Sequence, residues 1–445
     1  MSEKEKVSRR GWIKYAGAGV VVVAAAAGAG YYATQPKPTP TPTLTPTTPT
    51  PTPTTTPTPK GPPIRIGVMM GLTGAYSGNC KKMLDGAKLA IKHVNEAGGV
   101  LGRPLEPYIR DDELNPGIAV RRATELVETA KIEVLFGTLG THVVHALNDY
   151  MKKVGKIYFA CCIPVVATKK KDVRSPYTYF MLPSSAAISR SGGLYCAGLC
   201  KNWYLIYPDY SGGVDFSTYF KEGLEKKGAK VVGIDAAPLG CTDFSPFITR
   251  AMAAKPEGLA WCGQLGTDLQ NALKQCRGFK VTEKMYMFSG NNTLTDSMAA
   301  GIDAISGVYT FLDFYWALDR EPTRKYSEAY VAEYGEYPDT YSIGTYTAIR
   351  VWADAVNKAG TTDSEAVKKI LDSMKFDYCK GPQYFRWDGQ CMQDLFYVRG
   401  RKPEEVLKGR KPEEVPPNEK YNIFEFVHQI TSEEAEPTKE EEGYA

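Results

Sequence analysis

Short apolar runs alternate with stretches of helical spacing from residue 64 to residue 162. Residues 64–70 form the first apolar run, and a glycine-rich turn follows over 71–78. Over residues 82–95 the apolar side chains recur every three or four positions, which predicts a helix with one buried face. The next elements alternate in the same way, with strands 105–111, 134–136 and 157–162 and helices 116–129 and 142–154. This alternation predicts a parallel sheet with right-handed crossovers.

A second series of the same kind begins near residue 192. Its predicted helices are 192–201, 217–227, 246–254 and 269–277, and its strands are 203–207, 231–236, 258–262 and 285–288. Two series of similar size predict an α/β fold of two Rossmann-like lobes with parallel sheets, joined by a hinge, with the ligand site in the cleft. The predicted parts are 61–183 (lobe 1), 184–306 (lobe 2), 307–387 (return to lobe 1), 388–430 (return to lobe 2) and 431–445 (acidic tail).

The N-terminus has the composition of an export signal. Arg9 and Arg10 form a twin-arginine pattern, and an apolar run extends from Tyr15 to Ala33. Basic residues before an apolar core are typical of a signal segment, and the length of the run also suits an uncleaved membrane anchor. Residues 36–60 are almost purely Thr and Pro, which predicts an extended stalk. We therefore expect residues 1–35 to be a signal or anchor, and the globular part to be extracytoplasmic and tethered to a membrane.

Charge excludes some partners. The formal net charge is only +4 over 445 residues, with no basic stripe, so no nucleic-acid partner is expected. The last stretch, 432–445, is acidic and is predicted to be disordered. Just before it, the heptapeptide GRKPEEV occurs at 400–406 and again at 409–415, which suggests a duplicated surface insertion.

The residues with reactive side chains form no catalytic or metal-binding motif. The chain has no GxSxG, P-loop, HExxH or complete dinucleotide fingerprint, and His142 and His145 have no third metal ligand in reach. No catalytic residue, metal or cofactor is predicted. The ten cysteines are scattered, which disfavours a zinc site and, in an exported chain, favours disulfides. Cys379 and Cys391 flank a predicted hairpin and are the best candidates for a bridge.

Several segments resemble the branched-chain amino acid, amide and urea binding proteins of ABC importers, the type I periplasmic binding proteins. The strongest match runs from Gly86 to Leu105 and continues through Arg110, Asp111 and Asp112. The weaker matches are 66–74, 115–120, 207–210, 266–268, 334–335, 344–346 and 385–389, in the expected order. The resemblance covers about residues 64–399 and implies a Venus-flytrap clamp without enzymatic activity.

The first lobe offers two candidate ligand loops. Residues 137–141 end a strand and open a helix, so the backbone at Gly140 and the hydroxyl of Thr141 could hold a carboxylate or amide oxygen. The resemblance implies that ligand role for Thr141, although a threonine there also suits a helix N-cap. By the same resemblance the second loop falls at Ala160, Cys161 and Cys162, where two cysteines depart from the family pattern. A role as small buried residues is the alternative for this second loop.

The second lobe offers an aromatic and two polar positions. Tyr210, in the loop after the strand 203–207, is a candidate to close over the ligand, or it is an ordinary exposed loop residue. Asn291 occupies a position where amino-acid binders of this kind carry an acid, so an acceptor for an ammonium group would have to come from Asp209, Asp268 or Asp313. Asp268 is the acid included in the predicted site. Asn291 also begins an N-x-T glycosylation sequon.

The pattern and the resemblance together predict a substrate-binding protein of an ABC importer. We expect it to capture a small amino-acid-like, amide-like or urea-like solute by hinge closure, and to deliver it as a monomer to permease subunits in the membrane. A ligand-sensing ectodomain of the same fold is an alternative, disfavoured because residues 1–14 are too short to signal. A secreted α/β hydrolase is less favoured, because no nucleophile motif is present.

Overall fold

The computed structural model describes residues 61–74 and 76–444. These residues lie in one compact unit, Thr56–Ala445. The predicted signal or anchor, 1–35, and the predicted stalk, 36–60, fall outside the described residues. No helix among the described residues is both long and apolar enough to cross a bilayer.

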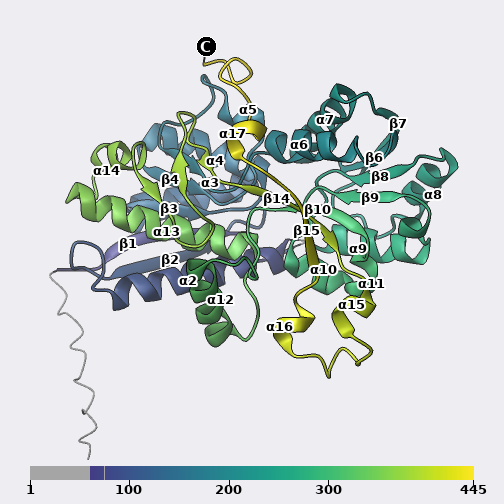
Figure 1. Ribbon diagram of the computed structural model, residues 1–445. Coiled ribbons are helices and arrows are strands. Elements are labelled where there is room, and N and C mark those ends of the chain that lie inside the picture. The colour runs from purple at the N-terminus through teal and green to yellow at the C-terminus, as the bar shows by residue number, and fades with distance from the viewer. Residues whose placement is uncertain (1–60, 75, 445) are drawn as a thin grey trace, which may run out of the picture. The chain divides into compact units, whose positions relative to one another are not determined.

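The first lobe is built on a five-stranded sheet in which every neighbouring pair is parallel. The strand order β2-β1-β3-β4-β5 places the first strand inside the sheet, as in a doubly wound fold (Figure 1). The strands are β1 (Ile64–Met70), β2 (Leu105–Asp111), β3 (Val134–Gly137), β4 (Ile157–Ala160) and β5 (Thr178–Phe180). The predicted parallel α/β architecture is confirmed for this lobe.

The second lobe is built on a seven-stranded sheet of order β15-β14-β10-β9-β8-β6-β7. Strands β6 to β10 pair in parallel, whereas β14 and β15 join the edge in antiparallel pairing. The strands are β6 (Asn202–Pro208), β7 (Lys230–Ala237), β8 (Gly258–Trp261), β9 (Tyr286–Ser289), β10 (Val308–Leu312), β14 (Leu395–Gly400) and β15 (Phe424–Ile430). A small antiparallel sheet contains β11 (Lys375–Phe376), β12 (Gln383–Phe385) and β13 (Cys391–Met392).

The helices pack on both sheets. In the first lobe they are α2 (Ser77–Glu96), α3 (Pro116–Thr124) with a π turn (Glu125–Thr129), α4 (Thr141–Val154), α5 (Val166–Lys169), α12 (Glu321–Tyr334), α13 (Thr340–Ala359) and α14 (Ser364–Leu371). In the second lobe they are α6 (Ser185–Cys196), α7 (Ser211–Lys226), α8 (Ser245–Ala253), α9 (Gly266–Gly278), α10 (Leu294–Ala300), α11 (Ile302–Ile305), α15 (Pro403–Leu407) and α16 (Pro417–Lys420), and a short α17 (Ser432–Ala435) follows β15. α2 and α13 touch at Gly86, where an added Cβ would lie 2.0 Å from the Ser342 carbonyl oxygen, so only glycine allows this approach.

The chain crosses between the lobes at positions that differ from two of the predicted boundaries. The first crossing runs from β5 to α6, over residues 181–184. The predicted return at 307 is wrong, because β10 pairs with β9 and β14 in the second sheet, so the chain leaves that lobe after Leu312. The predicted return at 388 is also early, because β13 pairs with β12 and Gln390 bridges to Phe180, so the third crossing lies between Met392 and Leu395.

A buried polar cluster joins these crossing segments. The carboxylate of Asp313, which follows β10, forms an ion pair with Lys380, and both side chains are buried. Gln393 accepts from Lys380 Nζ at 3.1 Å and donates through Nε2 to Asp313 and to the Met181 carbonyl, at 3.3 Å each. The Asp313 carboxylate is therefore occupied at the hinge. It is not the acceptor for an ammonium group that the sequence analysis left open.

The acidic C-terminal stretch is ordered, contrary to prediction. Glu436 and Glu442 are buried and form ion pairs with the buried Lys169 of α5. The prediction failed because it considered only the local charge of the stretch. Cations from other parts of the chain, Lys169 among them, pair with the buried carboxylates of the stretch.

The predicted disulfide is absent, and all ten cysteines are free thiols. Cys379 and Cys391 are both buried, and the Cys391 sulfur accepts from Gln383 Nε2 at 3.2 Å within the small sheet. The expectation of disulfides in an exported chain is therefore also wrong for this structure. Most of the thiols pack as small apolar side chains in the two cores.

The hinge cluster yields a stability prediction. Lys380→Met should lower the free energy of unfolding by about 3–5 kcal/mol, because it leaves the buried Asp313 carboxylate without its cation. Urea titration followed by circular dichroism measures this loss. Lys375→Met is the matched control, since Lys375 is exposed, and should change stability by less than about 0.5 kcal/mol. Equal stability of the two variants would contradict the role given to the cluster.

Candidate functional site

Polar residues gather where the strands of the two sheets end. In the first lobe, residues 138–140 connect β3 to α4, and residues 161–162 follow β4. In the second lobe, residues 209–210, 262–265 and 290–293 connect β6, β8 and β9 to α7, α9 and α10. In open parallel sheets, ligands bind outside the carboxyl ends of the strands. All the predicted site residues except two lie on these connections or open the helix that follows. Ala160 is the last residue of β4, and Asp268 lies in the first turn of α9.

The start of α4 presents unpaired donors. Gly140 is the N-cap, and because it has no side chain, the first turn of the helix has no side-chain cap. Thr141 is therefore the first helical residue rather than the cap. The residue is only 8% exposed, yet its Oγ1 has no hydrogen-bond partner among the residues described. Free amides and a free hydroxyl at a helix N-terminus are suited to an anionic or carbonyl oxygen.

His142 adds an acceptor next to Thr141. Its Nε2 lies 2.9 Å from the Leu114 carbonyl oxygen, which can only accept, so Nε2 carries a proton. In the neutral ring Nδ1 is then an acceptor, and this buried atom has no partner within the described part of the chain. The sequence pointed to His142 only as half of an unsupported metal pair. The structure gives it a place beside Tyr210, with the two ring centroids 6.3 Å apart.

Gln264 is a candidate that the sequence analysis missed. It lies between β8 and α9, is 1% exposed, and neither atom of its side-chain amide has a partner in residues 61–74 and 76–444. A buried unpaired amide costs stability, so its retention points to a ligand. Its position between a strand and the helix that begins at Gly266 could have pointed to it in the sequence. Its residue type could not, because nothing set it apart from glutamines in other loops.

Three tyrosines connect the predicted residues across the lobes. Tyr76 and Tyr341 come from the first lobe and Tyr210 from the second. Burial raises the pKa of Tyr210 to about 12, and Cys162 and Asp268 lie close enough to add to that rise. Burial also raises the pKa of Tyr76, and Tyr210 and Asp268 contribute to it. The phenols therefore stay protonated at neutral pH and can donate hydrogen bonds, and Tyr210 is not simply a solvent-exposed loop residue.

Asn291 faces the first lobe. Its side-chain amide lies 3.3 Å from the Tyr341 hydroxyl, and a second cross-lobe bond joins Asn79 Nδ2 to Asp296 Oδ2 at 3.2 Å. Asn291 is buried, so the sequon that it begins does not offer an accessible amide for a sugar. These bonds hold the strand ends of the two lobes together in this structure.

Of the two remaining second-lobe acids, only Asp268 is buried. Asp268 is buried and accepts from the Gly240 backbone N–H at 2.8 Å, and burial raises its pKa. One of its oxygens therefore holds the loop after β7, while its charge acts on Tyr76 and Tyr210. Asp209 is exposed.

Of the three predicted residues at the end of β4, two pack inside the first lobe and one lies near Tyr210. Ala160 is part of the sheet, pairs with Gly137 and Phe180, and uses its carbonyl to accept from Met181 N–H at 3.0 Å. Cys161 is fully buried beside Thr345 of α13, and burial raises its pKa to about 12. Both therefore pack inside the first lobe, the alternative that the sequence left open. Only Cys162 lies near Tyr210.

The site as a whole offers hydrogen bonds. Thr141, His142 and Gln264 present a hydroxyl, an acceptor nitrogen and an amide that are buried and unpartnered among the described residues. No group of His, Cys, Asp and Glu in residues 61–74 and 76–444 is placed to hold a metal ion. Such a set is suited to recognising a small molecule that carries both donors and acceptors.

Comparison with known proteins gives the same answer at the level of the family. The family described as "Periplasmic binding protein" matches residues 63–404. The leucine-, isoleucine-, valine-, threonine- and alanine-binding protein of Pseudomonas aeruginosa is 22% identical over 321 residues, which are 71% of this chain and 83% of that protein.

Solved structures agree in fold. A periplasmic binding protein from Burkholderia mallei superposes with a TM-score of 0.77 at 24% identity, over 85% of this chain and 97% of the other. A solute binding protein of an ABC transporter from Rhodopseudomonas palustris, in complex with 3,4-dihydroxybenzoic acid, gives 0.72 at 20% identity, over 83% and 97%. The family match spans most of the two-lobed region described above, and the chain therefore belongs to the periplasmic binding proteins of type I, extracytoplasmic solute-binding proteins of transporters rather than enzymes.

Proposed function

We propose that this chain is the substrate-binding component of an ABC importer for a small amino-acid-like or amide-like solute. One observation carries the proposal: Thr141, His142 and Gln264 keep buried polar atoms without partners at the facing strand ends of the two lobes. Each such atom costs stability in a folded protein, and a bound solute would supply the missing hydrogen bonds.

The arrangement of these groups favours a solute with a carboxylate or amide oxygen at one end. That oxygen would bind at the uncapped first turn of α4 and the Thr141 hydroxyl. An ammonium or amide N–H of the same solute would donate to His142 Nδ1, to the Gln264 oxygen or to Asp268. The relative from Pseudomonas aeruginosa, named for five amino acids, supports this class.

Capture would occur by hinge closure. Asn79–Asp296 and Asn291–Tyr341 join the two lobes, and Thr295 Oγ1 donates to Asp339 at 2.5 Å. These bonds exist only when the lobes are together, so a solute held between the strand ends would shift the population toward the closed form. The closed monomer would dock on permease subunits, with residues 1–60 as its membrane tether.

A thermal-shift panel tests the solute class. The panel is leucine, valine, threonine, acetamide, urea and benzoate, applied to the compact unit Thr56–Ala445. At least one amino acid or amide should raise the melting temperature, because binding only to the folded state stabilises it by mass action. Small-angle scattering with that compound should give a smaller radius of gyration than without it. A shift from benzoate alone would refute the amino-acid and amide class, and an unchanged radius would refute closure.

Thr141→Ala should weaken binding of the active compound about tenfold, from the ~1–2 kcal/mol of a lost hydrogen bond to a charged group. Titration calorimetry measures the change. Thr218→Ala, at an exposed position on α7, is the control and should bind as the parent does. Unchanged affinity in Thr141→Ala would remove this hydroxyl from the site.

Gln264→Leu should separate stability from function. The leucine removes two buried unpartnered atoms, so the ligand-free protein should be at least as stable as the parent, and binding should weaken by about 1–3 kcal/mol. Urea titration and calorimetry on the same preparation give both numbers. A clear loss of stability with full affinity would show that Gln264 is a structural residue.

A further inference from the structure

The last residues of the chain form a strap between the lobes. We use this name for residues 431–444, which leave β15 of the second sheet and end beside α5 of the first lobe (Figure 1). At the start of the strap, the backbone N–H of Gln393, on the third crossing, donates to Ser432 Oγ at 2.7 Å. The strap is therefore a fourth connection at the hinge, in addition to the three crossings described above.

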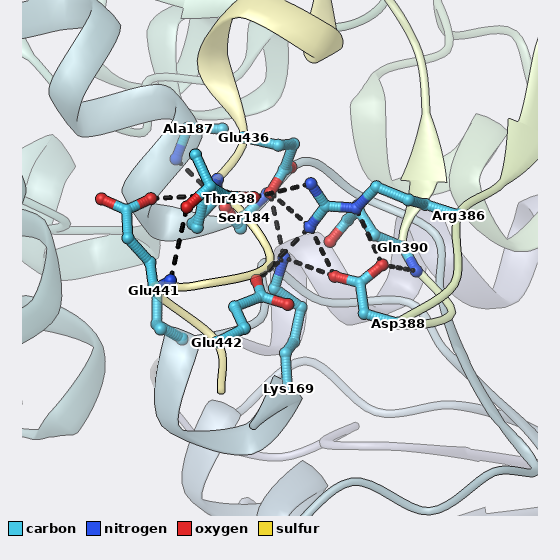
Figure 2. Close-up of polar contacts among 12 residues, drawn as sticks. Lys169, Ser184, Ala187, Arg386, Asp388, Gln390, Glu436, Thr438, Glu441 and Glu442 are labelled. Atoms are coloured by element: carbon cyan, nitrogen blue, oxygen red, sulfur yellow. Dashed lines mark hydrogen bonds and ion pairs between the residues drawn. The ribbon is translucent and has the colours of Figure 1, made fainter. Parts of the chain in front are cut away.

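Its first-lobe anchor is the buried ammonium of Lys169. Lys169 Nζ lies 2.9 Å from a Glu436 oxygen, 2.9 Å from a Glu442 oxygen and 3.1 Å from an Asp388 oxygen (Figure 2). All four side chains are essentially unexposed. The strap backbone adds a bond of 3.2 Å from Lys171 N–H to the Glu442 carbonyl.

Its second-lobe anchor is Arg190 of α6. Arg190 Nη2 donates to Glu441 at 2.6 Å. Between the two anchors, Glu436 also accepts at 2.9 Å from the backbone N–H of Ser184, the residue at which the chain enters α6 (Figure 2). One segment thus binds both lobes and the first crossing.

Charge in the anchor is not balanced. Lys169 and Arg386 are the cations, and Asp388, Glu436 and Glu442 are the carboxylates, which leaves one surplus negative charge if all are ionised. Glu442 Oε2 has no hydrogen-bond partner among the described residues. Burial, aided by the neighbouring charge of Asp388 and opposed by Lys169, raises the pKa of Glu442 to about 8. The surplus negative charge and the burial together make Glu442 hold its proton to a higher pH than an exposed glutamate does.

We propose that the strap is a releasable fastener at the hinge, which limits how far the ligand-free clamp opens. The inference rests on the proposed clamp function, but the contacts of the strap do not depend on a bound ligand. Release is feasible because Glu436 and Glu442 belong to the strap and would leave together. Asp388 would remain paired with Arg386, whose Nη2 lies at 2.6 Å and Nε at 3.0 Å from its two oxygens.

Two variants release the strap by different means. Lys169→Met removes the ammonium on which both strap glutamates converge, and a chain ending at Thr431 lacks the anchors altogether. In each ligand-free protein, carried on Thr56–Ala445, the amide of Ser184 should exchange with solvent on the order of tenfold faster, and scattering should give a larger radius of gyration. Glu440→Gln, at an exposed strap position, is the matched control and should behave as the parent does.

Acidity gives a separate test of the anchor. The folded-state pKa of Glu442 lies above its ordinary value near 4.5, so the stability that its protonated form contributes is lost as pH rises toward about 8. The groups that face it are Lys169 from α5, Arg386 and Asp388 from the hairpin, and Glu436 from the strap. Between pH 5 and pH 8 the parent should therefore show a rise in Ser184 exchange that exceeds the rise in the chemical rate. Glu442→Gln, which keeps the neutral form, should not.

The outcomes decide the proposal without any ligand. Faster Ser184 exchange in Lys169→Met, together with a radius of gyration equal to that of the parent, would overturn the proposal that the strap limits opening. So would an unchanged radius in the chain ending at Thr431, which also serves if Lys169→Met fails to fold. Failure of the solute panel would refute the proposed function and leave these measurements unaffected.

Discussion

Every connection between the lobes passes the buried contact of Asp313 with Lys380 and Gln393. Asp313 begins the second crossing, Gln393 lies on the third and reaches Met181 on the first, and Ser432 binds the Gln393 backbone on the fourth. A buried ion pair is costly unless its hydrogen bonds are satisfied, and here the amide of Gln393 satisfies both ions. The connections between the two sheets therefore meet at one fixed contact, about which the sheets can rotate as rigid bodies.

The strand ends differ from the hinge in how their polar groups are paired. At the hinge the charged groups have partners, whereas Thr141, His142 and Gln264 keep unpartnered polar atoms within the described chain. In a protein of marginal stability, such atoms are expected where a ligand completes them. The tyrosines around them stay neutral because burial raises their pKa, so the site offers hydrogen bonds without adding buried charge.

The strap links the two regions. It approaches the hinge through Ser432 and binds the first lobe through Lys169, which is on the helix after the loop that carries Cys162. Because the strap binds α5 of the first lobe and α6 of the second, it restrains the separation of these two helices. The same low-dielectric surroundings that strengthen its ion pairs raise the pKa of Glu442, which makes the anchor sensitive to pH.

The sequence determined the local elements and the architecture, because periodicity and glycine positions depend on neighbours along the chain: the strands 64–70 and 105–111 agree with the structure, as does the parallel pairing of β1 to β5 and of β6 to β10. It also indicated the strand-end loops of Gly140, Thr141, Tyr210 and Asn291, since in a parallel sheet such loops share one edge. The tertiary structure alone decided which residues meet at the facing strand ends, bringing Gln264 and Tyr341 there and placing Cys161 in the core. It alone decided that β10 joins the second sheet, that Cys379 and Cys391 stay unbonded, and that an acidic tail is ordered, because each depends on partners far away in the sequence.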